Sequence, residues 1–309
     1  MGAFPVQRIT LVGLGLIAGS LALALKKAGW QGELVAWGPR EPSLQKGVDL
    51  GVIDRFSLDL ETALADTGLI VVGAPPMATG EILTEILGVL EKSGSLPVVT
   101  DLASIKGWVI ARANTRYSRF VPGHPIAGSE NSGVAAANAD LFRGREAILT
   151  PVGDTDAQAV ETVRAMWQLV GSRVTVMSVE NHDAALAASS HSPHMLAYAL
   201  TKALAKDPLD PMKHGGGALR DMTRIAASDP VMWRDVALTN RDALIVALED
   251  VQKEIALLQN MIAKDDAGGL ESYFAECREQ RRRHDAILNP LLGVDGADDA
   301  EDTSECKDQ

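Results

Sequence analysis

The sequence has few cysteines and fewer basic than acidic residues. Only two cysteines, Cys277 and Cys306, occur in 309 residues, which argues against a disulfide framework and favours a reducing cytoplasm. The 29 Lys and Arg residues are outnumbered by 41 Asp and Glu residues, for a net charge of −12. This is the wrong sign for a chain whose affinity comes from neutralising phosphates. We therefore expect a cytoplasmic protein with no nucleic-acid partner.

The sequence also lacks a convincing membrane segment. Residues 9–25 carry no charge, which superficially resembles a signal peptide or a short anchor. The stretch contains three glycines, is short for a membrane span and ends at Lys26 and Lys27. We interpret it as a strand followed by a helix, and we expect no membrane partner.

What is present is the composition of a globular chain of about two domains. Hydrophobic residues make up 46% and charged residues 23%, and 309 residues are enough for a full core. Residues 293–309 hold seven acids and one lysine. This acidic tail is predicted to be disordered, either as a solubilising segment or as a binding site for a partner.

Short apolar segments alternate with helical stretches along the first half of the chain. The alternation predicts a parallel β-α-β sheet. From residue 180 onward only helical periodicity remains, so we place a domain boundary near residue 178. The predicted domains are an α/β domain at 1–178, an all-helical domain at 179–292 and the tail at 293–309. The expected strands are 9–12, 34–37, 69–73, 98–100, 120–121, 147–150 and 174–176. The expected helices are 16–28, 82–90, 105–113, 157–170, 180–205, 218–227, 230–263 and 270–288.

A glycine motif joins the first predicted strand to the first helix. Gly13 permits a tight turn, Gly15 lets the backbone approach a pyrophosphate, and Ala18 lets the helix pack closely on the strand. The pattern G-x-G-x-x-A in this setting predicts a dinucleotide site at the helix N-terminus. The residues predicted to bind the cofactor are Gly13, Leu14, Gly15, Leu16 and Ile17, together with Ala74 and Pro75 after the strand at 69–73.

The second strand does not end in the acid that usually holds an adenosine ribose. Trp37 is followed by Gly38, Pro39 and Arg40. Arg40 can pair with a 2′-phosphate, so we favour NADP over NAD as the cofactor. The alternative is that Arg40 is a solvated loop residue and NAD binds less selectively.

Five further motifs follow in order along the chain. The first is T-D-L-A-S-I-K-G at 100–107, and the second is V-P-G-H-P-I-A-G-S-E at 121–130, which contains His124. The helical region adds S-H-S-P-H at 190–194, R-D-M-T-R-I-A at 220–226 and S-D-P-V-M-W at 228–233. Together with the glycine loop, these motifs resemble the prephenate/arogenate dehydrogenase family over roughly residues 8–288.

The resemblance implies an NAD(P)-dependent oxidative decarboxylation in tyrosine biosynthesis. Prephenate would be converted to 4-hydroxyphenylpyruvate, or arogenate to tyrosine. It assigns to His124 the handling of the proton on the C4 hydroxyl of the substrate, a task that suits a neutral imidazole. Ser104 is expected to orient this imidazole and the nicotinamide. The implied fold is a Rossmann-like domain followed by a helical domain that forms a homodimer.

The same resemblance assigns residues to the carboxylates of the substrate. Arg224 matches the carboxylate-binding arginine, although a surface salt bridge with Asp221 or Asp229 is the alternative from the residues alone. His191 and His194 lie on one helical face and could form a metal half-site, a packed pair or a wall of the substrate site. No carboxylate or cysteine spacing completes a metal site, and the resemblance favours a substrate wall, His194 more than His191.

Two neighbouring residues bear on substrate choice. Ser129 stands where members restricted to arogenate tend to carry an acid that pairs with the amine, so we favour prephenate, with arogenate or dual specificity as the alternative. Glu130 is expected to be an active-site gate or hydrogen-bond partner, and the alternative is a cap at the start of a helix. A related β-hydroxyacid dehydrogenase would be expected to use a lysine early in the helical domain, and the helical domain of this chain has no lysine before Lys202. A protein that only senses NAD(P) would have no need for His124 and Arg224 to converge.

Overall fold

The chain divides into two compact units. The computed structural model describes residues 4–113, 116–128 and 131–288, and the units are residues 1–248 and 249–309. The acidic tail predicted at 293–309 lies outside the described residues. No helix of the described ranges is long and apolar enough to cross a membrane.

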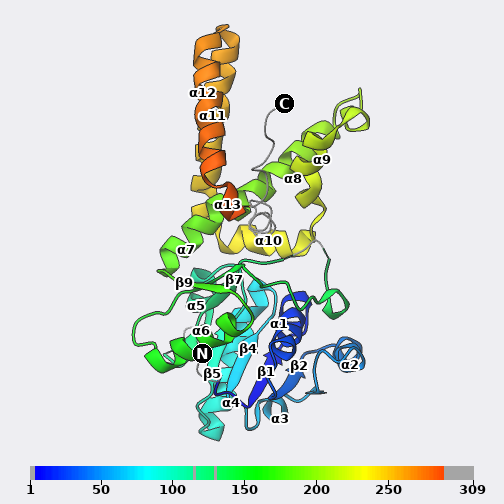
Figure 1. Cartoon of the computed structure of the whole chain (residues 1–309), viewed down its shortest axis with the longest axis vertical. Coiled ribbons are helices and arrows are strands. Elements are labelled where there is room, and N and C mark those ends of the chain that lie inside the picture. Colours follow the sequence, from blue (N-terminus) through cyan, green and yellow to red (C-terminus); the bar gives the residue numbers. More distant parts are fainter. Residues whose placement is uncertain (1–3, 114–115, 129–130, 289–309) are drawn as a thin grey trace, which may run out of the picture. The chain divides into compact units, whose positions relative to one another are not determined.

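The first unit contains a six-stranded parallel sheet with the order β3-β2-β1-β4-β5-β6 (Figure 1). This order reverses direction between β1 and β4, and in open α/β sheets ligands bind beyond the carboxyl ends of the strands at such a point. The predicted α/β fold is therefore confirmed. The strands are β1 (Arg8–Val12), β2 (Glu33–Trp37), β3 (Arg55–Ser57), β4 (Leu69–Val72), β5 (Val98–Asp101) and β6 (Phe120–Val121).

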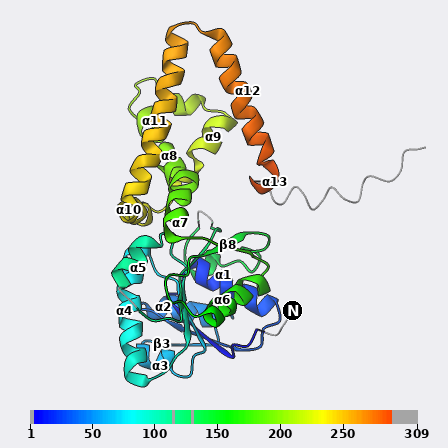
Figure 2. The same ribbon diagram turned by 90° about the vertical axis from the view of Figure 1, so that its left-hand side faces the viewer.

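Helices cover both faces of this sheet (Figure 2). Because successive side chains of a strand point to opposite faces, Leu69 and Val71 join the core beneath α1 and α6, whereas Ile70 and Val72 join the core beneath α4 and α5. Burial on both faces explains why β4 is apolar at all four positions. The helices are α1 (Leu16–Lys27), α2 (Glu41–Asp49), α3 (Leu60–Leu64), α4 (Pro76–Ser93), α5 (Gly107–Ala113) and α6 (Ala157–Leu169).

A second, three-stranded sheet follows β6. Its strands are β7 (Gly123–Pro125), β8 (Glu146–Leu149) and β9 (Arg173–Val176), with β7 antiparallel and β9 parallel to β8. The sequence predicted His124 at the end of a strand of the parallel sheet, but it lies on β7, opposite Ile148. The strand changes sheets at Pro122, a residue that cannot donate to a ladder.

The helical part of the first unit is more interrupted than its periodicity predicted. The helix expected at 180–205 contains a π turn, Ala187–His191, just before Pro193, which has no N–H for the helical ladder. The helix expected at 230–263 is broken at Asn240. The elements are α7 (Val179–Leu186), α8 (Ser192–Leu204), α9 (Gly217–Thr223), α10 (Pro230–Thr239) and α11 (Arg241–Ala263), with 3-10 turns at Val134–Ala136, Pro211–His214 and Arg224–Ala227.

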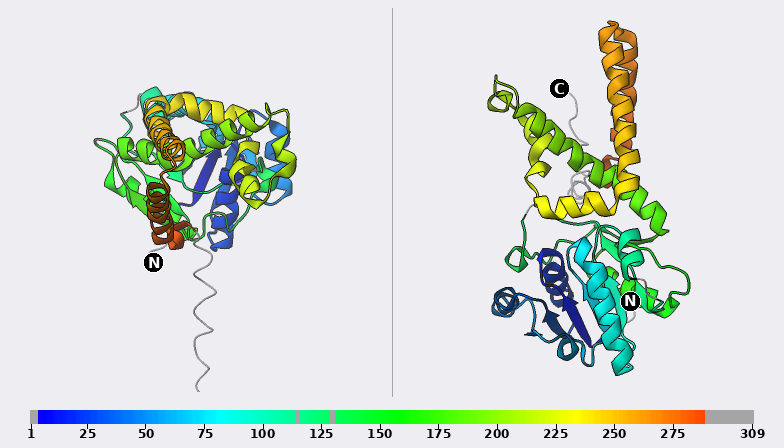
Figure 3. Two further views of the ribbon diagram at one scale, coloured as in Figure 1. Left: turned by 90° about the horizontal axis from the view of Figure 1, so that it is seen from above. Right: turned by 180° about the vertical axis from the view of Figure 1, so that it is seen from behind.

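The second unit is a pair of antiparallel helices joined by a short turn; they overlap in the rear view of Figure 3 and diverge from the turn in Figure 2. It comprises α11 from Glu249 onward, α12 (Ala267–Arg283) and the short α13 (Asp285–Leu288). Tyr273 Oη on α12 donates to Glu254 Oε2 on α11 at 2.9 Å. Several apolar side chains of this unit are exposed: Ile255, Leu257, Ile262, Phe274, Ile287 and Leu288.

Candidate active site

The predicted cofactor loop lies at the carboxyl end of β1. Gly13, Leu14, Gly15, Leu16 and Ile17 connect β1 to the first turn of α1. That turn contains no acidic residue and no side-chain cap, so its N–H groups are available to an anion. A Cβ on Gly15 would have no heavy atom within 4 Å, which leaves open space at the start of the helix. The loop therefore fits the pyrophosphate of a dinucleotide.

The loop after β4 faces this turn across the point where the strand order reverses. Gly13 has a φ of +93°, and a Cβ there would lie 2.7 Å from the carbonyl oxygen of Gly73. Only glycine therefore allows the two loops to approach so closely. Ala74 is half-buried and Pro75 is exposed beside them, just before α4. Both residues predicted to bind the cofactor after β4 thus lie at the same crevice as the glycine loop.

The end of β2 carries no carboxylate. Trp37 closes the strand, its indole Nε1 donates to the carbonyl of Leu58 at 3.1 Å, and Arg40 follows at the N-cap of α2. Arg40 is exposed and forms no ion pair within the described part of the chain. Its guanidinium is thus free to meet a phosphate.

His124 is half-buried and belongs to a chain of three polar side chains. Its Nδ1 lies 2.9 Å from Nε2 of His182, and Nδ1 of His182 lies 2.7 Å from Oδ1 of Asp183. Gly123, directly before His124, lies against the end of β5, because a Cβ on it would be 3.2 Å from the carbonyl oxygen of Asp101. The histidine is thus held at the carboxyl edge of the parallel sheet.

The surroundings of His124 favour its neutral form. Burial is the main cause that lowers the pKa of His124 well below 6.5, and electrostatic repulsion by His182, Lys106 and His191 in their protonated forms lowers it further. Burial raises the pKa of the Asp183 carboxyl, but the hydrogen bond from His182 and those from two backbone amides outweigh this effect and lower it. A neutral imidazole whose hydrogen-bond partner, His182, is itself paired with a carboxylate is suited to accept a proton.

A fully buried ion pair supports the strand that carries His124. Lys106 Nζ binds both Asp101 Oδ1 and the carbonyl oxygen of Gly123, and both side chains of the pair are 0% exposed. Burial lowers the pKa of Lys106, and the Asp101 carboxylate opposes that effect. The sequence analysis assigned no role to Lys106 beyond its place in the motif at 100–107. Nothing local in the sequence shows that its side chain reaches Gly123, the residue before His124.

Ser104 lies in the same loop between β5 and α5 and is half-buried. Among the described residues it has no hydrogen bond to His124, whose Nδ1 partner is His182 instead. The predicted orienting contact with the imidazole is therefore made by another residue. A role of Ser104 toward the nicotinamide stays a prediction.

His191 lies in the interior rather than at a surface. It is 1% exposed, and the Asn240 side-chain amide donates to its Nδ1 at 3.0 Å and to the Asp183 carbonyl at 2.9 Å. Burial lowers the pKa of His191 to about 4. Of the alternatives left open by the sequence, these contacts correspond to a packed residue. The break at Asn240 is what brings this amide to His191.

His194 is half-buried and stacks on Trp233. The ring centroids are 3.5 Å apart with an angle of 21° between the planes, and Nδ1 of His194 lies 2.9 Å from the carbonyl oxygen of Ser190. Because a carbonyl only accepts, Nδ1 carries the proton and Nε2 is left for a ligand. Burial lowers the pKa of His194, and the positive charge of Arg224 lowers it further. The helix that carries His194, α8, packs against the 3-10 turn at Arg224–Ala227.

Arg224 begins the 3-10 turn after α9 and is exposed. The salt bridges that the sequence left as alternatives are not seen in the described ranges. Asp221 pairs with Arg220 at 3.3 Å, and Asp229 caps α10 by accepting from the backbone N–H of Met232 at 2.8 Å. The guanidinium is thus available for a carboxylate of a ligand. The other two residues predicted to contact the substrate, Ser129 and Glu130, lie outside the described residues.

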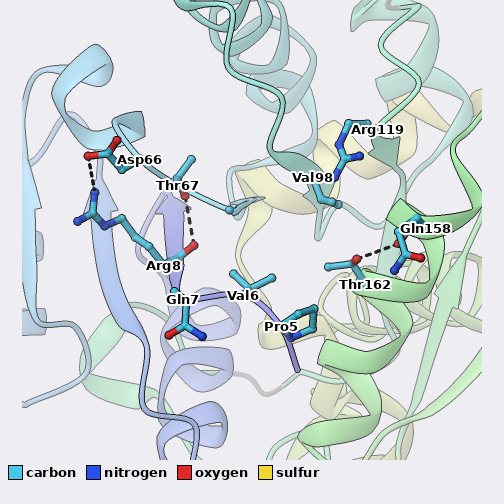
Figure 4. A pocket seen from close by; sticks show the side chains of 11 residues that line it. Pro5, Val6, Gln7, Arg8, Asp66, Thr67, Val98, Arg119, Gln158 and Thr162 are labelled. Atoms are coloured by element: carbon cyan, nitrogen blue, oxygen red, sulfur yellow. Dashed lines mark hydrogen bonds and ion pairs between the residues drawn. The ribbon is translucent and has the colours of Figure 1, made fainter. Parts of the chain in front are cut away.

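A cavity of about 440 Å³ lies at the opposite edge of the parallel sheet (Figure 4). Its lining includes Arg8, Val98 and Arg119, which stand at the amino ends of β1, β5 and β6. Arg8 pairs with Asp66 at 3.5 Å and Arg119 with Asp156 at 3.0 Å. Because ligands of such sheets bind beyond the carboxyl ends of the strands and these cations are paired, this cavity is not the active site.

Two glycine turns lie where the strand order reverses, and a neutral histidine, His124, lies beside the end of β5. Together they define an NAD(P)-dependent dehydrogenase. A family model described as the nucleotide-binding domain of prephenate dehydrogenase matches residues 21–176. A second, described as the dimerization domain of prephenate dehydrogenase, matches residues 178–276. The chain therefore belongs to the prephenate dehydrogenase family, which confirms the resemblance.

Individual relatives agree with this assignment. The chain is 32% identical to the cyclohexadienyl dehydrogenase of Zymomonas mobilis, covering 89% of this chain and 95% of the relative. It is 34% identical to the prephenate dehydrogenase of Bacillus subtilis, covering 88% and 75%. The structure resembles that of prephenate dehydrogenase from Aquifex aeolicus in complex with hydroxyphenyl propionate and NAD+, with a TM-score of 0.84, 34% identity and coverage of 90% and 98%. Arogenate dehydrogenase of Synechocystis is also similar, with a TM-score of 0.77, 26% identity and coverage of 90% and 99%.

Sequence reasoning missed His182, Asp183, Trp233 and Asn240 as parts of this site. His182 and Asp183 form an adjacent His-Asp pair on α7, which is the one local signal that could have drawn notice. Nothing in the sequence shows that this pair meets His124, 58 residues earlier.

Proposed function

We propose that this chain catalyses the NAD(P)-dependent oxidative decarboxylation of prephenate to 4-hydroxyphenylpyruvate, a step towards tyrosine. The observation that carries the proposal is the neutral His124, hydrogen-bonded to His182 at 2.9 Å at the edge of the sheet where the cofactor loop lies. The similarity to the Aquifex enzyme, whose structure holds hydroxyphenyl propionate and NAD+, supports it.

The proposed reaction needs a base and little else from the protein. The glycine loop, through Gly13 and Gly15, would hold NAD(P)+, which would supply the acceptor for the hydride from ring C4 of the substrate. His124 accepts the C4 hydroxyl proton while carbonyl character develops there, and can return it once the ring becomes aromatic. Loss of the ring carboxylate as CO2 supplies the electron pair that makes the ring aromatic. The thermodynamic driving force therefore comes from aromatisation of the substrate ring, and the protein orients the substrate.

The two carboxylates of prephenate require cations, which Arg224 and a protonatable His194 supply in the proposed site. A carboxylate bound there would favour the charged form of His194, whose Nε2 could then donate a hydrogen bond. His191 is packed in the interior, so it is poorly placed to bind the substrate directly. Both His191 and His194 contact the Trp233 ring, so His191 supports His194 through Trp233.

Replacing Arg224 with glutamine is expected to raise the KM for prephenate about 30-fold, or about 2 kcal/mol, since a charge-assisted pair with a carboxylate is lost. Steady-state kinetics at saturating cofactor measure this. Arg220→Gln is the matched control, because Arg220 lies one turn earlier and already pairs with Asp221. An unchanged KM in the Arg224 variant would refute its assignment to the substrate.

For the cofactor we propose a preference for NADP, which rests on the exposed Arg40 and the missing acid at the end of β2. The NAD+ in the Aquifex relative makes NAD the alternative. Arg40→Ala is expected to lower kcat/KM for NADP about 10-fold and to change that for NAD by less than about 2-fold. Lys46→Ala, an exposed lysine on α2, is the control. Equal effects on both cofactors would show that Arg40 is a bystander.

The decisive test of the proposed function is a spectrophotometric assay of NAD(P)H formation. Prephenate and arogenate are each supplied with NAD and with NADP. Turnover of prephenate is expected, with arogenate slower or inactive, because Ser129 cannot form an ion pair with its amine. Faster turnover of arogenate would favour an arogenate or dual-specificity enzyme. Cofactor binding without turnover of either substrate would favour a protein that senses NAD(P).

We also propose that the protein is a homodimer that acts in the cytoplasm. The family model for the second half of the chain is described as a dimerization domain, and α10 to α12 expose apolar side chains such as Val231, Leu238, Ile255 and Phe274 that a second copy would cover. The scarcity of cysteine supports a reducing compartment.

A further inference from the structure

His182 and Asp183 form a hydrogen-bonded chain behind the proposed base. His182 is fully buried on α7, with Nε2 at 2.9 Å from Nδ1 of His124 and Nδ1 at 2.7 Å from Oδ1 of Asp183. The two contacts use the two ring nitrogens of His182. The proton on the side of Asp183 therefore decides which nitrogen of His124 carries a proton.

The protons in this chain can be placed one at a time. Asp183 Oδ1 accepts from the backbone N–H of Lys106 at 2.9 Å, and Oδ2 accepts from that of Gly107 at 2.8 Å. An ionised carboxylate only accepts, so Nδ1 of His182 carries the proton. The neutral His182 ring then has its lone pair on Nε2, which must accept from Nδ1 of His124. The lone pair of a neutral His124 is therefore left on Nε2.

We propose that His182 and Asp183 are positioning residues that hold His124 in the Nδ1–H tautomer, so that Nε2 is the atom that accepts the substrate proton. The identity of the proton donor rests on the proposed function, whereas the tautomer is a property of the protein without ligand.

The backbone around Asp183 is shaped for this contact. A Cβ on Gly107 would lie 2.9 Å from Asp183 Oδ2, so a glycine at the start of α5 lets the carboxylate reach two amides at once. Asn240 holds the carbonyl of Asp183 at 2.9 Å from the other side. The carboxylate is thus fixed before any substrate arrives, which is what a preorganised site requires.

The charged groups around His124 are consistent with a single tautomer. Lys106 is committed to Asp101 and Gly123, and Nδ1 of His191 accepts from Asn240. Neither therefore competes with His182 for His124 in the described part of the structure. When His124 takes up a proton, the Nδ1–H bond to His182 strengthens, and the Asp183 carboxylate stabilises the resulting charge through that ring.

The tautomer can be measured in the wild-type protein without substrate. Protein labelled with ¹⁵N-histidine is studied at neutral pH by long-range ¹H–¹⁵N correlation NMR, and His124→Asn identifies the His124 signals. A protonated Nδ1 and an unprotonated Nε2 are expected for His124. A protonated Nε2, or an even mixture of tautomers, would overturn the proposal whether or not prephenate proves to be the substrate.

Variants test the consequence for turnover. His182→Leu and Asp183→Asn are expected to lower kcat about 10-fold to 10²-fold, with KM for the substrate nearly unchanged and mixed tautomers at His124. His182→Gln should recover part of the loss, because its amide oxygen can still accept from Nδ1–H. The exposed His214→Leu is the matched control and should behave as wild type. Wild-type kcat together with a single Nδ1–H tautomer in His182→Leu would refute the proposal.

Discussion

Replacing His124 with asparagine is expected to lower kcat about 10²-fold or more while leaving cofactor affinity nearly unchanged. The asparagine amide can still donate to Nε2 of His182, so the packing is preserved, but no acceptor reaches the former position of Nε2. Only help to the transition state is removed, which lowers kcat rather than cofactor binding. Steady-state turnover with prephenate and fluorescence titration with the cofactor measure the two quantities.

The control for this variant is His214→Asn, an exposed histidine outside the site, which should keep full activity. Because the pKa of His124 lies well below 6.5, protonation should inactivate the wild-type enzyme only below the usual histidine range. The acid limb of kcat/KM is expected there and should be absent from the residual activity of His124→Asn. Near-normal turnover in the variant would exclude His124 as the base.

Replacing Lys106 with methionine is expected to lower the free energy of unfolding by about 3–5 kcal/mol, since a buried carboxylate loses its counter-ion. Asp101 Oδ1 keeps one other contact, the N–H of Ala103 at 2.9 Å, which does not neutralise the charge. Denaturant unfolding of both proteins measures the difference. Activity should also fall, because the carbonyl of Gly123 next to His124 loses its donor.

The double variant Lys106→Met/Asp101→Asn separates charge from packing. Removing both charges should restore most of the lost stability, because replacing a whole buried pair costs far less than breaking it. The exposed pair Lys253 and Asp250, at 2.6 Å, provides a comparison. Lys253→Met should change stability by less than about 1 kcal/mol. Equal effects at the two sites would show that burial does not govern the Lys106 pair.

The sequence predicted the α/β fold and the family because both depend on short-range patterns. Apolar runs of strand length and the glycine loop are local signals. The turn at Gly13 is readable because a positive φ and a close contact with Gly73 demand glycine. Strand β3 was missed, since its three residues, Arg55–Ser57, form no apolar run and owe their conformation to pairing with β2.

Helix interruptions were harder to predict because tertiary contacts cause them. Periodicity runs smoothly through Asn240, yet the helix breaks there, where the side chain binds His191 and the Asp183 carbonyl. The π turn before Pro193 had a local signal in the proline. The π turn only widens the helix locally, and a hydrophobic pattern does not distinguish a helix with such a turn from an uninterrupted helix.

The sequence by itself determined the fold class, the family and the cofactor loop, because these are recorded in local patterns and short motifs, and the resemblance to the family pointed to His124 as the candidate base. The tertiary structure alone decided what surrounds that base. His182 replaces Ser104 as the partner of His124, Lys106 supports Gly123, and His191 is packed inside. Such contacts join residues from distant helices and strands, and neither periodicity nor motif spacing records which buried side chains meet.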